Sequence, residues 1–322
     1  MVMRDLDRRS ILSALAGTAV GVGLLDRTSF TGRDRTEVRS VRPMMGTLVT
    51  AAAVTTSPDR AASGIDAAFA EMERLIGVFS RHDADAQVAR LNASGTLTDP
   101  SPELVSVLRT ARRVHDRTEG AFDPTVLPVL ADTLRGDTSG GSADAVPGFD
   151  EVRIRDGAVH TAVPITLDGI AKGYIVDRGC ATLRRWVDEA MIEAGGDIRA
   201  FGGSEGRWHI GIHDPRGDGY LSRIRLRNGA VATSGSYEVS HGERTSGADP
   251  VIRPATARRP EEDTCASVVS STAERADALS TAAFVMDDSA AMSILERVDA
   301  GGMFLTTSGE LIRTDSWREI PG

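Results

Sequence analysis

The sequence predicts an α+β fold, in which helices pack against largely antiparallel strands. Two observations lead to this prediction. Two long amphipathic helices come first in the chain, and the short β-rich runs that follow are separated by hairpin-like turns. A doubly wound sheet would show a regular alternation of strand and helix, which is missing. The 322 residues, 41% of them hydrophobic, are enough for one large domain or two modest ones with a sizeable core.

The first predicted helix runs from Ser57 to Phe79. Its apolar residues recur at steps of four, three, four and three, which places them on one face, and a Ser-Pro pair stands at its start. A second pair, Ser101-Pro102, begins another helix that ends near Gly120. The following stretch, 135–148, is rich in Gly, Ser and Asp and predicts an exposed loop. Beyond it the patterns predict strands at 152–154, 208–212 and 224–226, and helices at 173–187, 273–286 and 289–298.

The first 30 residues predict an export signal. Arg8-Arg9 precedes an uncharged apolar run that ends at Leu25, about 15 residues long. This is shorter than the roughly 20 residues that span a bilayer. Paired arginines before such a run are typical of the twin-arginine export route. We therefore expect residues 1–30 to be a signal or an uncleaved anchor, and residues 31–322 to form a domain outside the cytoplasmic membrane, in the periplasm or at the cell surface.

Charge and rare residues exclude some functions. The net charge of −9 gives no overall basic field, which argues against nucleic acid as a partner. Lys172 is the single lysine, and because Gly173 and Tyr174 follow it, the chain has no P-loop. The only cysteines, Cys180 and Cys265, can form one disulfide in an oxidising compartment or remain as buried free thiols.

Two glycine-rich segments, 165–174 and 193–202, are candidate ligand-binding loops. Small residues allow a ligand to approach the backbone closely, and the first segment precedes a predicted helix, whose N–H groups favour phosphate. Lys172 would supply a positive charge there. The alternative for each segment is a tight turn without a ligand.

Asp277 and Thr281 are four residues apart, so on a helix they lie on one face. A carboxylate and a hydroxyl are hard oxygen ligands of the kind that Mg²⁺ accepts, although a solvated helix face would show the same pair. His209 and His213 have the spacing of a zinc pair on a helix, but their segment predicts a strand and contains no metalloprotease glutamate.

Eight short segments, taken in their order along the chain, resemble the FAD:protein FMN transferase (ApbE-like) family from Met44 to beyond Phe284. The matching pieces are Met45-Gly46-Thr47, Phe79-Ser80 through Arg90-Leu91-Asn92, Gly120 to Thr125, Ile170 to Tyr174 with Asp177, Ala194 to Arg199, Trp208 with Asp214-Pro215, Ala232 to Gly235 with Tyr237, and Ala276 to Thr281.

The resemblance implies a mixed, largely antiparallel sheet architecture flanked by helices, and Mg²⁺-dependent transfer of FMN from FAD to a Thr or Ser hydroxyl of a partner protein, with release of AMP. It implies that the partner is an acceptor flavoprotein of the cell envelope. By this similarity Mg²⁺ would be held by Asp277, Thr281 and the carbonyl of Gly169. The residues at the FAD site would be Met45, Ala121, Phe122, Asp123, Lys172, Gly195, Gly196, Ser234 and Gly235. No catalytic residue is identified.

The chain departs from the family pattern at three places. Residues 250–257 stand where the family usually reads His-Ile-Ile-Asp-Pro-Arg-Thr-Gly, and both the His and the Asp are missing. Thr166 replaces a usual Asp, while an Asp appears at 168, and His82 stands where a flavin-stacking aromatic is expected. Two alternatives therefore stay open: a Mg²⁺-dependent FAD pyrophosphatase that releases FMN and AMP, and an extracytoplasmic flavin-binding protein without catalysis.

Overall fold

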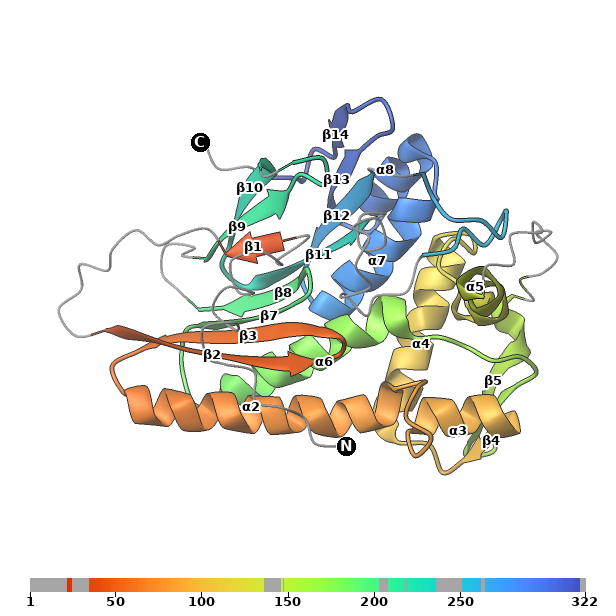
Figure 1. Cartoon of the computed structure of the whole chain (residues 1–322), viewed down its shortest axis with the longest axis horizontal. Coiled ribbons are helices and arrows are strands. Elements are labelled where there is room, and N and C mark those ends of the chain that lie inside the picture. The colour runs from red at the N-terminus through yellow and green to blue at the C-terminus, as the bar shows by residue number, and fades with distance from the viewer. Residues whose placement is uncertain are drawn as a thin grey trace.

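An eight-stranded antiparallel sheet forms the centre of the computed structural model, with helices on one face and a smaller sheet on the other (Figure 1). The structure describes residues 22–24, 35–135, 146, 148–202, 208–217, 219–235, 251–261 and 264–318. The central strands, in spatial order, are β14 (Leu311–Arg313), β13 (Gly301–Leu305), β12 (Cys265–Ser270), β11 (Gly229–Gly235), β8 (Asp197–Phe201), β7 (Ala190–Ala194), β3 (Thr47–Thr55) and β2 (Thr36–Met44).

Two three-stranded sheets complete the β-structure. The first consists of β1 (Val22–Leu24), β9 (Trp208–His213) and β10 (Tyr220–Leu226), and the second of β4 (Thr96–Thr98), β6 (Ala158–Thr161) and β5 (Val152–Arg155). All pairings among the described strands are antiparallel, as the sequence predicts. β1 belongs to the predicted export signal, and its backbone pairs with β9 from Val22↔Ile212 to Leu24↔Ile210.

The helical layer contains the longest elements. Its members are α2 (Pro58–Phe79), α3 (Gln87–Ser94), α4 (Pro102–Arg117), α5 (Leu127–Leu134), α6 (Asp168–Leu183), α7 (Ala273–Val285) and α8 (Asp288–Arg297), with short 3₁₀ turns η1 (Pro124–Val126) and η3 (Phe149–Glu151). α2, α6 and α7 cover the central sheet (Figure 1). Among the described residues no helix is long and apolar enough to cross a membrane.

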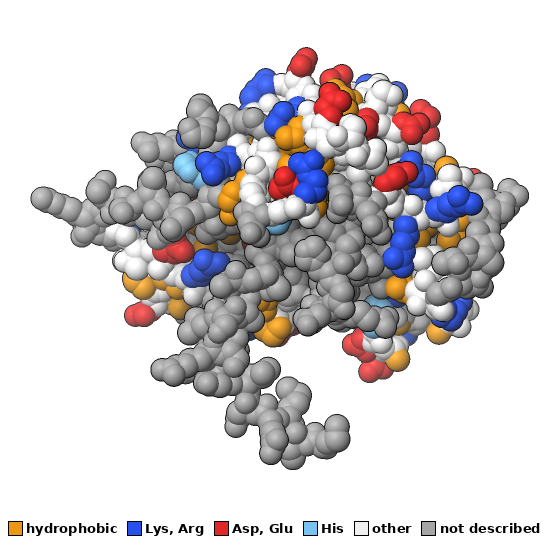
Figure 2. All heavy atoms as spheres, turned by 45° about the horizontal axis from the view of Figure 1, so that its top comes forward, with side chains coloured by type: hydrophobic (Ala, Val, Ile, Leu, Met, Phe, Trp, Pro, Cys, Tyr) orange, Lys and Arg blue, Asp and Glu red, His pale blue; other side chains and the backbone are white. Residues whose placement is uncertain are grey.

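The central sheet is buried on both faces. Along β3, Val49, Ala51 and Ala53 pack in the core under the helices, whereas Ala52 and Val54 pack in a second core against β9 and β10. Successive strand residues point to opposite faces, so a strand between two layers must be apolar at nearly every position. Figure 2 shows arginine and acidic side chains interspersed on the described part of one outer face, which gives that face no single-sign patch.

The helices predicted from periodicity are confirmed, with α6 corrected at both ends. α2 and α4 begin at their prolines, and the Ser101 hydroxyl accepts the N–H of Leu104 at 3.2 Å. α6, however, begins at Asp168 rather than at Gly173, so Lys172 lies inside this helix and not before it, and the helix ends at Leu183 rather than at Val187. Gly173 is a packing position inside the helix, against the backbone of Ala273.

Several other predictions can be compared with the structure. The strands at 152–154, 208–212 and 224–226 are confirmed, and so are the helices at 273–286 and 289–298 within a residue or two. His209 and His213 lie on a strand, as expected. Cys180 and Cys265 are buried free thiols. Most of the predicted export signal and most of the loop at 135–148 lie outside the described residues, as do Tyr237 and Pro250.

Candidate active site

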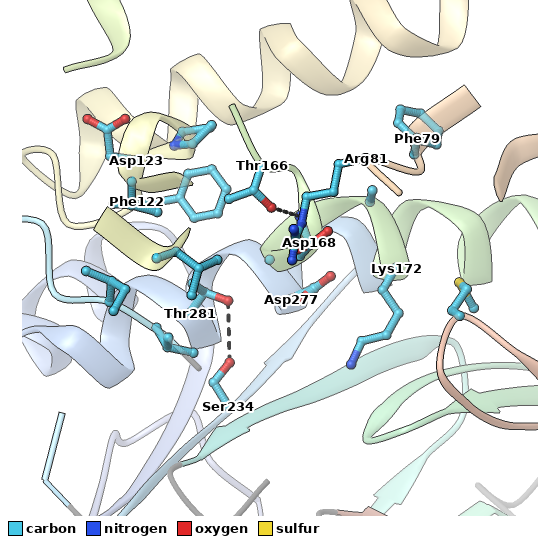
Figure 3. A pocket seen from close by; sticks show the side chains of 18 of the residues that line it. Phe79, Arg81, Phe122, Asp123, Thr166, Asp168, Lys172, Ser234, Asp277 and Thr281 are labelled. Carbon is cyan, nitrogen blue, oxygen red and sulfur yellow. Dashed lines mark hydrogen bonds and ion pairs between the residues drawn. The ribbon is translucent and has the colours of Figure 1, made fainter. Parts of the chain in front are cut away.

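A cavity of about 450 Å³ opens where the ends of several elements meet (Figure 3). Its walls come from the β2–β3 turn, the end of α2 and the segment after it, residues 121–126, the first turns of α6, β11, residues 251–254, and α7. All the site residues named from the sequence line it except Gly195, Gly196 and Gly235. The structure thus gathers Met45, Ala121, Phe122, Asp123, Gly169, Lys172, Ser234, Asp277 and Thr281 around one space.

Close packing of α6 against α7 brings the predicted metal ligands together. A Cβ atom at Gly173 would lie 2.3 Å from the carbonyl oxygen of Ala273, and one at Gly169 would lie 2.8 Å from Thr281 Oγ1. Real Cβ atoms essentially never approach heavy atoms this closely, so only glycine allows this helix separation. The backbone of Gly169 therefore lies directly beside the Thr281 side chain.

Oxygen atoms concentrate at this contact. Asp277 is only 4% exposed, and its Oδ2 accepts the backbone N–H of Gly173 at 3.0 Å. Thr281 Oγ1 lies 3.4 Å from Ser234 Oγ, which in turn lies 2.9 Å from Ser280 Oγ (Figure 3). A buried carboxylate, hydroxyls and a nearby backbone carbonyl form a donor set that fits a hard cation such as Mg²⁺.

A second kind of metal site would be a cluster of His, Cys, Asp or Glu side chains. Among the described residues no group of three or more His, Cys, Asp or Glu side chains is arranged to hold an ion. Of the three carboxylates that line the cavity, Asp277 is the one on α7, so an ion bound beside Thr281 would take its remaining protein ligands from hydroxyl and carbonyl oxygens, and others from water or substrate phosphates.

Lys172 places a positive charge in the cavity wall. Its Nζ donates to the carbonyl oxygen of Gly195 at 3.1 Å and lies 3.7 Å from Oδ2 of Asp197, a side chain that is 2% exposed. Gly195 and Gly196 form the β7–β8 turn, where both have positive φ, 55° and 94°. The turn that these two glycines form holds the Lys172 ammonium through the Gly195 carbonyl, and neither glycine lines the cavity itself.

A buried carboxyl group lies behind the same turn. Glu193 Oε1 accepts the N–H of Gly196 at 3.3 Å. Burial is the largest influence on this group and raises the pKa of Glu193 to about 7, although Lys172 and the backbone N–H groups act in the opposite direction. The turn that supports Lys172 therefore contains a group that titrates near neutral pH.

A second cation in the cavity was missed by the sequence analysis. Arg81 follows α2, and its Nε lies 2.8 Å from Oδ2 of Asp168, at the first turn of α6 (Figure 3). Both residues line the cavity. The sequence analysis named Asp168 only as a departure from the family pattern. No local signal could connect it to Arg81, because the two residues are 87 positions apart.

The remaining wall is largely apolar. Phe79, Phe122, Val126 and Leu130 contribute to it, together with Ile252 from the segment that departs from the family pattern. This segment thus lines the cavity without the usual His and Asp. An apolar wall next to a few convergent polar groups is typical of a site for a small molecule with an aromatic part.

Asp123 has a structural partner for each oxygen. Its Oδ1 accepts both the N–H and the hydroxyl of Thr125, at 2.8 and 2.7 Å, and its Oδ2 lies 3.5 Å from His115 Nδ1. The same His115 atom lies 2.9 Å from the carbonyl oxygen of Phe122. This network fixes the turn that presents Phe122 to the cavity.

Known proteins resemble this chain in sequence and in fold. The sequence matches the ApbE family over residues 45–304. A Haemophilus influenzae protein named FAD:protein FMN transferase is 30% identical over an alignment of 246 residues that covers 68% of this chain and 71% of that protein. A Vibrio cholerae protein of the same name is 27% identical over an alignment of 248 residues that covers 70% of this chain and 74% of that protein. The crystal structure of the ApbE protein from Thermotoga maritima aligns with a TM-score of 0.76 and 28% identity, covering 87% of this chain and 98% of that one.

Proposed function

Since the chain belongs to the ApbE family, whose matched relatives are FAD:protein FMN transferases, we propose that this enzyme transfers FMN from FAD to a Thr or Ser hydroxyl of a partner protein, with Mg²⁺, and releases AMP. The observation that carries the proposal is the junction of α6 and α7. There a buried carboxylate, a hydroxyl and a close backbone lie in one cavity with two cations and an apolar wall.

The reaction is one substitution at phosphorus. The acceptor hydroxyl oxygen forms a bond to the flavin-side phosphorus of the FAD pyrophosphate, the bond from that phosphorus to the bridging oxygen breaks, and the hydroxyl proton is lost. AMP leaves with the bonding electron pair. Positioning and charge stabilisation account for most catalysis of phosphoryl transfer, so the task of the protein is to hold the diphosphate and to exclude water.

The residues of the cavity divide this task. Asp277, Thr281 and the carbonyl of Gly169 would hold Mg²⁺, which would withdraw charge from the phosphate oxygens. The Lys172 ammonium offsets diphosphate charge from the side of the β7–β8 turn. The apolar wall around Phe122 would accept the flavin ring and keep water away from it. If the flavin is held there, the flavin-side phosphorus has a fixed position, and the acceptor hydroxyl can approach it in the orientation that substitution requires.

The export signal and the envelope partner belong to this proposal. The paired arginines and the short apolar run support export by the twin-arginine route, with residues 1–30 as signal or anchor and residues 31–322 as the working domain. A domain delivered there would modify flavoproteins outside the cytoplasmic membrane.

One incubation separates the proposed activity from its alternatives. The purified protein is mixed with FAD, Mg²⁺ and a candidate acceptor, and the products are examined by denaturing electrophoresis and chromatography. Fluorescent flavin that stays with the acceptor supports the transferase. Free FMN and AMP without labelled acceptor, across a panel of envelope flavoproteins, would indicate a pyrophosphatase. Unchanged FAD with tight binding would contradict both enzymatic activities.

A matched pair of variants tests the metal ligand. Asp277→Ala is expected to abolish Mg²⁺-dependent turnover while the circular dichroism spectrum stays that of the parent. Asp287→Ala is the control, because this aspartate is exposed at the start of α8 and its side chain makes no cap hydrogen bond there. Full activity of Asp277→Ala would show that the metal ligand is assigned wrongly.

A further inference from the structure

Arg81 is a charged side chain held inside the cavity by a carboxylate from another element. Its side chain is 11% exposed, whereas that of Asp168 is 51% exposed. The ion pair joins the segment after α2 to the first turn of α6 and lies in the same cavity wall as Gly169 (Figure 3). The guanidinium is therefore fixed next to the proposed metal ligands rather than extended into solvent.

The position of the guanidinium suits an anionic ligand. Arg81 lines the cavity, so a phosphate oxygen bound there could accept hydrogen bonds from it. Arginine suits this role because its planar, permanently charged fork matches phosphate geometry.

Two cations line the cavity from different elements. The described lining of the cavity contains two permanent cations, Arg81 and Lys172, and three carboxylates. Asp123 is bonded to Thr125, and Asp277 accepts an N–H of α6 and is the proposed ligand of a cation. A bound diphosphate, with its two negative charges, would face Lys172 from one element and Arg81 from another.

We propose that Arg81, held in place by Asp168, is a second cationic ligand for the diphosphate of FAD. The inference rests on the proposed function for the identity of the ligand and adds a binding residue to that site. Arg81 contacts the phosphate oxygens directly. Asp168 is a positioning residue, which keeps the guanidinium turned into the cavity.

Ligand binding without Mg²⁺ and without an acceptor tests the inference. Affinities for FAD, ADP and riboflavin are measured by calorimetry for the full chain, for Arg81→Met and for Arg90→Met. Arg90 is the control, because it is an exposed arginine of α3 that does not line the cavity. We expect Arg81→Met to weaken FAD and ADP about tenfold or more, since a charge-assisted hydrogen bond is lost, and to leave riboflavin unchanged.

Two further variants separate contact from positioning. Arg81→Lys keeps the charge without the fork and should recover part of the ADP affinity. Asp168→Asn keeps an acceptor for Arg81 Nε but removes the charge, and should weaken ADP less than Arg81→Met does. Thermal unfolding of each variant shows whether the fold is intact.

Three results would overturn the inference. The first is an Arg81→Met variant that binds FAD and ADP as the parent does. The second is an equal loss of riboflavin, which would make Arg81 a structural residue. The third is a parent that binds FAD no better than riboflavin. Failure of flavin transfer to every acceptor would instead contradict the proposed function, because diphosphate binding is measured here without any transfer.

Discussion

Replacing Gly169 by alanine tests how the α6–α7 contact holds the Thr281 hydroxyl. The new Cβ would lie 2.8 Å from Oγ1, 3.0 Å from Cγ2 and 3.3 Å from Cβ of Thr281. Carbon atoms prefer contacts of about 3.5 Å, so the Thr281 side chain or the helix that bears it must retreat by roughly half an ångström. Gly169 has φ −84°, which alanine tolerates, so the contact itself is the perturbation.

Two effects follow from this displacement. Overpacking costs about 1–3 kcal/mol of unfolding free energy. Mg²⁺ tolerates little distortion of its ligands, so we expect its affinity to fall by about 10- to 100-fold. Both quantities come from one assay, thermal unfolding as a function of Mg²⁺ concentration, because an ion that binds the folded state raises the melting temperature.

Gly77→Ala is the matched control. Gly77 lies in α2, and a Cβ there would meet no heavy atom within 4 Å. We expect this variant to be as stable as the parent or more stable by up to about 1 kcal/mol, with unchanged Mg²⁺ response. If Gly169→Ala responded to Mg²⁺ at the same concentrations as the parent, the Thr281 hydroxyl would not be a metal ligand held by this contact.

Three further outcomes are expected. Asp177 accepts the first two backbone N–H groups of α7 at 3.0 and 2.9 Å, so Asp177→Asn should lower the urea unfolding free energy by about 1–3 kcal/mol, whereas Ser57→Ala, which removes no cap hydrogen bond, should not. Burial raises the pKa of Glu193 to about 7, so its protonated form stabilises the fold fully below about pH 4.5, and this stabilisation is lost as the pH rises through 7. Glu193→Gln should therefore make the unfolding free energy less dependent on pH between pH 5 and 8. Burial raises the pKa of the Cys265 thiol to about 12 and that of Cys180 well above its usual range, so a disulfide reagent should label neither thiol before unfolding.

The sequence predicted the elements whose cause is local. A proline in the first turn and a repeating apolar face predict the helices that begin at Pro58 and Pro102, and the structure confirms both. Strands β5, β9 and β10 of the two smaller sheets were also predicted, because turns bound them. Hairpin-like turns also predicted antiparallel pairing between consecutive strands, as observed for β9 and β10.

Features with a distant cause were not predictable in this way. Gly173 is typical of a helix boundary, yet it lies inside α6, because the carbonyl of Ala273 approaches it from a helix that is remote in sequence. For the same reason Gly195 and Gly196 belong to the support of Lys172 rather than to the cavity surface. Family resemblance supplied most of the site, since spacing alone connected only Asp277 with Thr281.

The two halves of the cavity are built from different kinds of structure. Asp277 and Thr281 lie on a helix that is packed against the sheet and against α6 through glycines, so a change there alters stability and ion binding together. In the other half, Ile252 packs in a small core with Val129 and Leu130. Arg81, His82 and Pro254 instead lie in loops, where substitutions disturb the core little. Substitutions at these three loop positions should therefore alter affinity for FAD and for the acceptor while the unfolding free energy changes little. A library of variants at these loop positions tests this when the affinities for riboflavin and FAD are measured for each variant. If α6 and α7 alone selected the substrate, no variant would change the ratio of the two affinities.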